Sequence, residues 1–231
     1  MSKKKVVLFL VEGITDKIAL GLILSRLVEN EQVHFELTDG DLTGQDDVTA
    51  SNIKTKVWQH VKNFLEKKRY RKQDLQQVIH LIDTDGAFVP DTAVVSTTDS
   101  EEKTHYSQKN IFAKNCQAIK KRNRLKRDSV SCLHTTTKIA GVPYQIFYFS
   151  RNLEHALHNQ IEELTTRQKQ NLSEALEDDY CENLEGFVQL LRSEEIMIPG
   201  DYQESWEFIK QDLNSLMRGS NFSIFFERDA C

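Results

Sequence analysis

The feature that most constrains the fold is an apolar segment, residues 6–11, that ends directly at Glu12. A short run dominated by valine and leucine is typical of a strand buried on both faces, as in a parallel sheet between helices. Gly13 then allows a turn, and Thr15 and Asp16 favour the start of a helix. In open α/β sheets, functional groups gather beyond the carboxyl ends of the strands. Glu12 and Asp16 are therefore candidate site residues, and a solvated turn is the alternative.

A second apolar segment ends in two carboxylates. Residues 78–82 predict another buried strand, and Asp83 and Asp85 follow with one residue between them. Residues i and i+2 of an extended chain point the same way, so both side chains can bind one cation. If the two strands are neighbours, Glu12 lies at the same edge. Carboxylates that converge without a basic partner repel one another unless a divalent cation neutralises them, and Mg²⁺ is the expected ion.

The spacing of apolar residues predicts an α/β fold. We expect helices at residues 15–28 and 48–68, a strand at residues 33–37 between them, and a further strand at residues 144–149. Alternating strands and helices predict right-handed crossovers and a mostly parallel sheet sandwiched by helices.

Helical patterns dominate the last third of the chain. We therefore expect a core at residues 1–160 and a helical extension at residues 161–231, which packs on the core or on a partner. Helices are predicted at residues 166–176, 181–191 and 202–217. Residues 222–226 predict an edge strand or a docking tail.

Cationic residues cluster at residues 110–127, where we expect a helix with one buried side. The chain has a net charge of −5, so any contact with nucleic acid must come from a local patch. An ordinary solvated helix face is the alternative, but the absence of acidic residues here favours a phosphate-binding surface. Its candidate residues are Lys114, Lys120, Lys121, Arg122, Arg124, Lys126 and Arg127.

Composition and length limit the class of protein. The chain is 39% hydrophobic and 28% charged, which is typical of a globular protein with a substantial core. No apolar stretch is long enough to cross a bilayer, and the first residues lack a signal-peptide pattern. The four cysteines form no CxxC pair, so we expect free thiols and a cytoplasmic protein. Residues 87–107 predict a long loop that is either a substrate gate or merely mobile.

The acidic motifs resemble those of the TOPRIM domain. Glu12-Gly13 follows a first strand, Asp16 lies in the next turn, and Asp83-x-Asp85 follows a later strand. The EGxTD form is similar to the OLD-like nuclease branch, and the resemblance spans roughly residues 4–160. It implies a metal-dependent nuclease that hydrolyses phosphodiester bonds with Mg²⁺ or Mn²⁺.

The resemblance also implies roles for individual residues. Glu12, Asp83 and Asp85 would hold one ion, and Asp16 would support a second. With a single ion, Glu12 would act as general base. In OLD-like relatives, a strand here leads into a helix with a further acidic residue, and Glu154 matches that position. Arg151 lies nearby and is expected to steady charge on a phosphate.

Several functions and partners stay open at this point. Small TOPRIM proteins of this kind resemble antiphage effectors that work with a separate OLD-like or ABC-type ATPase, as in the PARIS system, and the nuclease that matures 5S ribosomal RNA. The chain lacks a Walker A segment, so an ATPase would be a partner. The helical extension favours the effector. DNA, RNA and transfer RNA all remain candidate substrates, and a homodimer is compatible with this interpretation.

Two other classes are retained as alternatives. One is a non-catalytic subunit that binds nucleic acid or regulates a partner. The other is a haloacid-dehalogenase-type phosphatase, because Asp83-Thr84-Asp85-Gly86 looks like its DxDG loop. Those enzymes usually place the loop on their first strand, whereas here it follows the third, and Glu12 would have no role.

Overall fold

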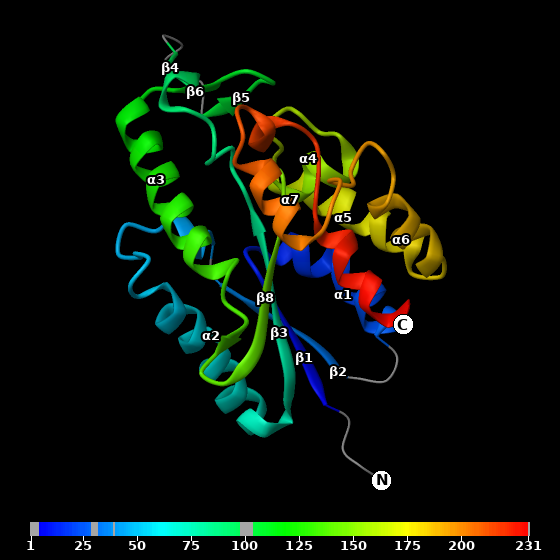
Figure 1. The fold of residues 1–231 in the computed structure, drawn as a ribbon. Helices are drawn as coiled ribbons and strands as arrows, with labels where there is room; N and C mark the ends of the chain where they lie inside the picture. Colours follow the sequence, from blue (N-terminus) through cyan, green and yellow to red (C-terminus); the bar gives the residue numbers. More distant parts are fainter. Residues whose placement is uncertain (1–4, 29–31, 39, 98–103, 231) are drawn as a thin grey trace.

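A five-stranded sheet forms the centre of the protein. The computed structural model describes residues 5–28, 32–38, 40–97 and 104–230 (Figure 1). The strand order among these residues is β2-β1-β3-β8-β7. The first four strands are parallel, and β7 pairs antiparallel with β8. The prediction of an α/β fold with a mostly parallel sheet is therefore confirmed. The bounds are β1 Val6–Val11, β2 Gln32–Leu37, β3 Leu75–Asp83, β7 Lys138–Ile139 and β8 Val142–Phe149.

Helices cover both faces of this sheet (Figure 1). Successive side chains of β1 point to opposite faces, so Leu8 and Leu10 join one apolar core while Val7 and Phe9 join the other. None of the described helices combines the length and the apolar character that a membrane span requires. The first face is covered by α2 (Ile53–Lys68), α3 (Cys116–Leu133) and α7 (Tyr202–Ile209). The second is covered by α1 (Ile14–Leu27), α4 (Leu153–His158), α5 (Thr166–Tyr180) and α6 (Leu184–Leu191).

The end of the chain packs on the sheet. The predicted strand at residues 222–226 is wrong, because Phe222–Ala230 is a 3₁₀ helix, η5. The ring of Phe222 lies 5.7 Å from that of Phe147 on β8, so η5 packs on the apolar face of the sheet. The predicted helix at residues 202–217 is also interrupted. α7 ends at Ile209, and Asp212 has a left-handed backbone (φ 45°) before η4 (Asn214–Leu216).

A small second sheet replaces much of the predicted loop at residues 87–107. It joins β4 (Val94–Ser96), β6 (Ile111–Ala113) and β5 (His105–Tyr106) above α3 (Figure 1). Residues 98–103 of the predicted loop lie outside the described residues. The predicted helix start at residue 110 is wrong, because α3 begins at Cys116. The side chain of Asn115 accepts a hydrogen bond from the Ala118 N–H and caps the helix there.

Buried His80 leads to a first prediction. It lies within β3, and its Nδ1 is 2.9 Å from the Tyr144 hydroxyl. Burial, followed by His60, lowers the pKa of His80 from 6.5 to about 3. Between these two pKa values the unfolded chain binds a proton at His80 and the folded chain does not. The free energy of unfolding is therefore highest above pH 6.5 and decreases as pH falls toward 3. Between pH 6.5 and about pH 4.5 this loss amounts to about 2 to 3 kcal/mol.

We expect His80→Gln to remove this acid-dependent loss. Thermal and urea unfolding measured across the same pH range should give a flatter profile for the variant than for the wild type. The matched control is His105→Gln, in the small second sheet, and its profile should follow the wild type. Parallel profiles for wild type and His80→Gln would contradict the assignment.

Candidate functional site

The carboxyl edge of the sheet brings together acidic side chains from distant parts of the chain. Glu12 follows β1, Asp83 ends β3, and Asp16 and Glu154 lie in the first turns of α1 and α4. Glu12 Oε1 accepts a hydrogen bond from the Asp83 N–H at 3.3 Å. Burial raises the pKa of Asp83, and repulsion by Glu12, Asp16, Asp85 and Glu154 raises it further. These five residues are close enough to interact, and we call them the acidic cluster.

Asp85 reaches this edge by a different geometry from the one predicted. β3 ends at Asp83, so the chain is no longer extended, and Asp85 has a left-handed backbone (φ 48°). The turn is fixed by two hydrogen bonds of 2.8 Å: the Asp85 N–H donates to the Arg151 carbonyl, and the Arg151 N–H donates to Thr84 Oγ1. The prediction that Asp83 and Asp85 point the same way along an extended strand is therefore wrong.

The Asp85 carboxylate faces a buried lysine. Lys126 on α3 is 0% exposed, and its Nζ lies 2.6 Å from Asp85 Oδ2, 3.1 Å from Asp41 Oδ2 and 3.9 Å from Glu12 Oε1. The ammonium group also donates to the Asp83 carbonyl at 2.6 Å. This corrects two predictions: Lys126 is not on the exposed cationic face, and the carboxylates do have a basic partner.

Lys126 balances the negative charge of Asp41 and Asp85 but leaves the pKa of Glu12 and Asp16 raised. Burial alone would lower the pKa of Lys126, but attraction by Asp41, Asp85 and Glu12 outweighs this and raises it. Burial would likewise raise the pKa of Asp41, yet Lys126 holds it below its ordinary value. The pKa of Glu12 stays raised because burial outweighs the attraction of Lys126. Burial, opposed by the Gly13 N–H and assisted by Glu154, raises the pKa of Asp16 to about 6.

Sequence reasoning missed Asp41 and the inward position of Lys126. Asp41 follows β2, and its carboxylate accepts hydrogen bonds from the N–H groups of Thr43 and Gly44 at the start of η1 (Leu42–Gly44). The sequence signal for Asp41 is that this acidic residue follows β2, another parallel strand of the sheet, as Glu12 follows β1. Lys126 lies four residues before buried Val130, so the helical period placed it on the inner stripe.

Other cations of the basic segment, residues 110–127, also form hydrogen bonds or ion pairs within the protein. The Arg122 guanidinium donates to the Asp85 carbonyl at 2.8 Å and to the Tyr106 hydroxyl at 3.3 Å. Arg127 donates to the Ala87 carbonyl at 3.0 Å, and Lys121 pairs with Asp46 at 2.8 Å. The predicted cations that remain on the surface are Lys114, Lys120, Lys121 and Arg124, with Lys120 only partly exposed.

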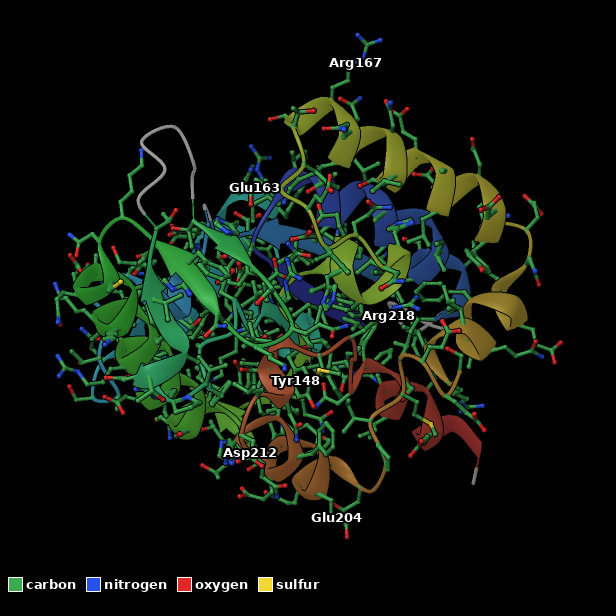
Figure 2. The ribbon with its side chains drawn as sticks, turned by 90° about the horizontal axis from the view of Figure 1, so that it is seen from above. Tyr148, Glu163, Arg167, Glu204, Asp212 and Arg218 are labelled. Carbon is green, nitrogen blue, oxygen red and sulfur yellow. The ribbon has the colours of Figure 1, made fainter. Side chains whose placement is uncertain are left out.

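A second lysine borders the acidic cluster on the α5 side. Lys169 Nζ lies 3.3 Å from Oε1 of buried Glu154. Burial would lower the pKa of Lys169, but Glu154 and Asp83 raise it. Figure 2 looks down on this edge, and its Arg167 side chain points away from the molecule.

Arg151 is placed next to the acidic cluster but is already engaged. Only 5% of the residue is exposed, and its guanidinium lies 4.9 Å from the centre of the Tyr106 ring. It also donates to the Ile161 carbonyl at 2.6 Å. Burial lowers the pKa of Arg151, which favours contact with a negative group. Its Nε is buried and has no hydrogen-bond partner among the described residues.

The acidic cluster has the donor chemistry for Mg²⁺, although its side chains are not converged on one point. Among the described residues, no three or more Asp, Glu, His or Cys side chains are arranged as a metal-binding group. Two of the carboxylates are engaged within the protein: Lys126 holds Asp85, and Asp16 Oδ2 accepts the Gly13 N–H at 2.9 Å. The donors that remain are carboxylate oxygens, the ligands Mg²⁺ prefers. Glu12, Asp83, Asp16 and Glu154 therefore fit a hard cation by chemistry and charge.

The chain was compared with known proteins at the levels of family, sequence and structure. No family model, no curated protein and no solved structure gives a match.

Proposed function

We propose that the protein is a magnesium-dependent phosphodiester hydrolase of TOPRIM type that acts on nucleic acid. The observation that carries the proposal is the gathering of Glu12, Asp16, Asp83 and Glu154 at the carboxyl edge of the sheet, where Glu12 Oε1 accepts a hydrogen bond from the Asp83 N–H at 3.3 Å. Burial, the largest cause, and repulsion between the acids raise the pKa of Glu12, Asp16 and Asp83, although Lys126 and Lys169 border them. A divalent cation would remove the repulsion.

The contacts support a different choice of metal ligands from the one expected from the sequence. Glu12 and Asp83 are the central ligands, with Asp16 and Glu154 beside them, while Asp85 belongs with Lys126. When bound, the ion supplies Lewis acidity and a more acidic bound water. Lys169 keeps Glu154 in position, and Lys126 fixes the turn that carries Asp83 by holding its carbonyl. Arg151 lies beside these residues, and its guanidinium is held by the Ile161 carbonyl and the Tyr106 ring.

A direct assay tests the proposal. Purified protein is incubated with Mg²⁺ or Mn²⁺ and, separately, with single-stranded RNA, transfer RNA, plasmid DNA and p-nitrophenyl phosphate. We expect cleavage of at least one nucleic acid, loss of cleavage with a chelator, and no release of nitrophenol. Nitrophenol release would favour the phosphatase class.

The exposed cations of α3 lead to a second prediction. Lys120 and Arg124 are one helical turn apart, so they present two charges to the same backbone. The double change Lys120→Gln and Arg124→Gln should weaken nucleic-acid binding by about tenfold and reduce the salt dependence of binding by about two charges. Fluorescence anisotropy at several salt concentrations measures both quantities.

The control for this pair is a cation on β7, an edge strand of the central sheet. Lys138 on β7 is exposed and lies beside the start of β8, so Lys138→Gln should leave binding unchanged. Equal weakening by both variants would show that net charge, not the α3 surface, governs binding.

One observation favours a second candidate function, a non-catalytic subunit. Lys126 supplies part of the charge that a cation would bring, so the cluster could also serve as a fixed structural element. Binding of nucleic acid without cleavage under all metal conditions would select this alternative.

The effector role with a separate ATPase, and the ribosomal RNA-processing role, both rest on the resemblance alone. Cleavage that appears only after an ATPase co-purified with the native protein is added would favour the effector. Trimming of a 5S ribosomal RNA precursor by the isolated protein would favour RNA processing.

A further inference from the structure

The outer edge of β2 is open. β2 ends the strand order and pairs only with β1 among the described residues. The Gln32 N–H donates to the Lys5 carbonyl and the Thr38 N–H to the Val11 carbonyl, both at 2.9 Å. The even-numbered residues of β2 therefore direct their backbone groups toward β1. By alternation, Val33, Phe35 and Leu37 direct theirs outward, where an added strand would pair with them.

Two helices turn this edge into a groove of about 670 Å³. One wall comes from α1 and includes Gly21 and Leu22, and the other comes from α2. A Cβ built on Gly21 would meet nothing within 4 Å, and Leu22 is 38% exposed, so this wall is open and partly apolar. Such a groove has the lining for one extended chain.

The groove has a strongly cationic character in a protein that is acidic overall. Lys17, Lys67 and Lys68 line it and are exposed. His34 and His60 lie on the α2 side, and Glu36 is the acidic residue among the described lining. On the α1 side, Val33, Phe35 and Leu37 pack with the apolar core. A strand added here would meet apolar neighbours on one face and positive charge on the other.

We propose that this groove binds an extended segment of a partner protein in which apolar and acidic side chains alternate. The segment would add to β2 as a sixth strand through the backbone groups of Val33, Phe35 and Leu37. Its apolar side chains would lie against Phe35 and Leu22, and its acidic side chains would lie near Lys67 and Lys68. None of these residues belongs to the acidic cluster, so the inference does not depend on the proposed function.

Two other occupants fit less well. A second copy of the chain pairing through β2 would bring another set of the same lysines into the groove, and like charges would repel. A nucleic acid would satisfy the lysines, but it would leave the outward backbone groups of Val33, Phe35 and Leu37 without the alternating donors and acceptors of a strand. Both are outcomes of the test below.

A synthetic peptide tests the proposal with the full chain. The probe is a fluorescein-labelled peptide of about seven residues that alternates valine and glutamate, and its control replaces glutamate by lysine. We expect the glutamate peptide to bind with a Kd on the order of 100 µM and the lysine peptide to bind at least tenfold more weakly. Bound peptide should slow hydrogen exchange at the amides of Val33, Phe35 and Leu37.

Matched variants locate the site. Lys67→Gln with Lys68→Gln should weaken peptide binding about fivefold, whereas Lys54→Gln with Lys62→Gln, on the same helix but outside the groove lining, should not. Val33→Pro removes an outward N–H while leaving the bonds to β1, so it should also weaken binding. Circular dichroism and thermal unfolding verify that each variant is folded.

Four results would overturn the proposal. The first is no binding of the glutamate peptide, and the second is equal binding of both peptides. The third is displacement of the peptide by a single-stranded oligonucleotide whose own binding needs Lys67 and Lys68. The fourth is self-association of the protein that Val33→Pro abolishes. The third result would assign the groove to nucleic acid and the fourth to a second copy of the chain.

Discussion

Asp83→Asn is expected to abolish metal-dependent hydrolysis and, at the same time, to stabilise the metal-free protein. Asparagine keeps the size of the side chain and the backbone contacts of this position, including the Asp83 carbonyl that accepts from Lys126. It removes one negative charge from a place where burial, Glu12, Asp16, Asp85 and Glu154 all raise the pKa of the carboxyl group. Loss of a central ligand should reduce the rate by about three orders of magnitude.

The stability gain follows from the sign of the pKa shift. An acid whose folded pKa is raised contributes stability at low pH and loses it as pH rises, so ionised Asp83 destabilises the fold at neutral pH. Removing that charge should stabilise the metal-free protein by about 1 to 3 kcal/mol. Chemical unfolding at neutral pH with a chelator present measures the gain. Mg²⁺ should then stabilise the wild type but not the variant.

Asp85→Asn is the matched control, because its carboxylate is paired directly with Lys126, whose Nζ lies 2.6 Å from Asp85 Oδ2. This variant should destabilise the protein, opposite in sign to Asp83→Asn. A stability loss for both variants would mean that Asp83 is compensated in the folded protein. Retained hydrolysis in Asp83→Asn would refute its role as a ligand.

The sequence predicts much of this fold because the signals are local. The apolar run before Glu12 is typical of a strand covered on both faces, and the helical spacing after Asp16 and around Val57 and Phe64 indicates which faces α1 and α2 bury. The carboxyl ends of parallel strands share one edge, so Glu12 and Asp83 meet, as predicted, although 71 residues separate them.

The rest depends on tertiary contacts that no local pattern contains. The helical period to Val130 separates Lys126 from Arg124, but the partners of Lys126, Asp41 and Asp85, follow only from the packing of α3 on the carboxyl edge. Asp85 leaves the strand direction because its N–H pairs with the carbonyl of Arg151, which is 66 residues away. Phe222 begins a 3₁₀ helix and packs on Phe147 of β8, a contact between residues 75 positions apart.

Lys126→Met should be the most destabilising single change in the site. Methionine fills a similar volume but leaves the partly buried Asp41 and Asp85 beside Glu12 without the ammonium group that lies near all three. Breaking a buried ion pair by removing one partner typically costs about 3 to 5 kcal/mol. Lys121→Met, which removes an exposed pair with Asp46 on the same helix, should cost less than about 1 kcal/mol.

The pH dependence of this loss identifies its cause. Lys126 lowers the pKa of Asp41, so the stability it confers is present above the ordinary pKa of 3.8 and disappears as pH falls below it. The difference in unfolding free energy between wild type and Lys126→Met should therefore shrink in acid. If the single variant does not fold at neutral pH, Lys126→Met with Asp85→Asn removes both charges and should recover part of the loss. A loss that is independent of pH and is not relieved by Asp85→Asn would indicate that Lys126 acts through packing, and the charge balance argued for this site would fail.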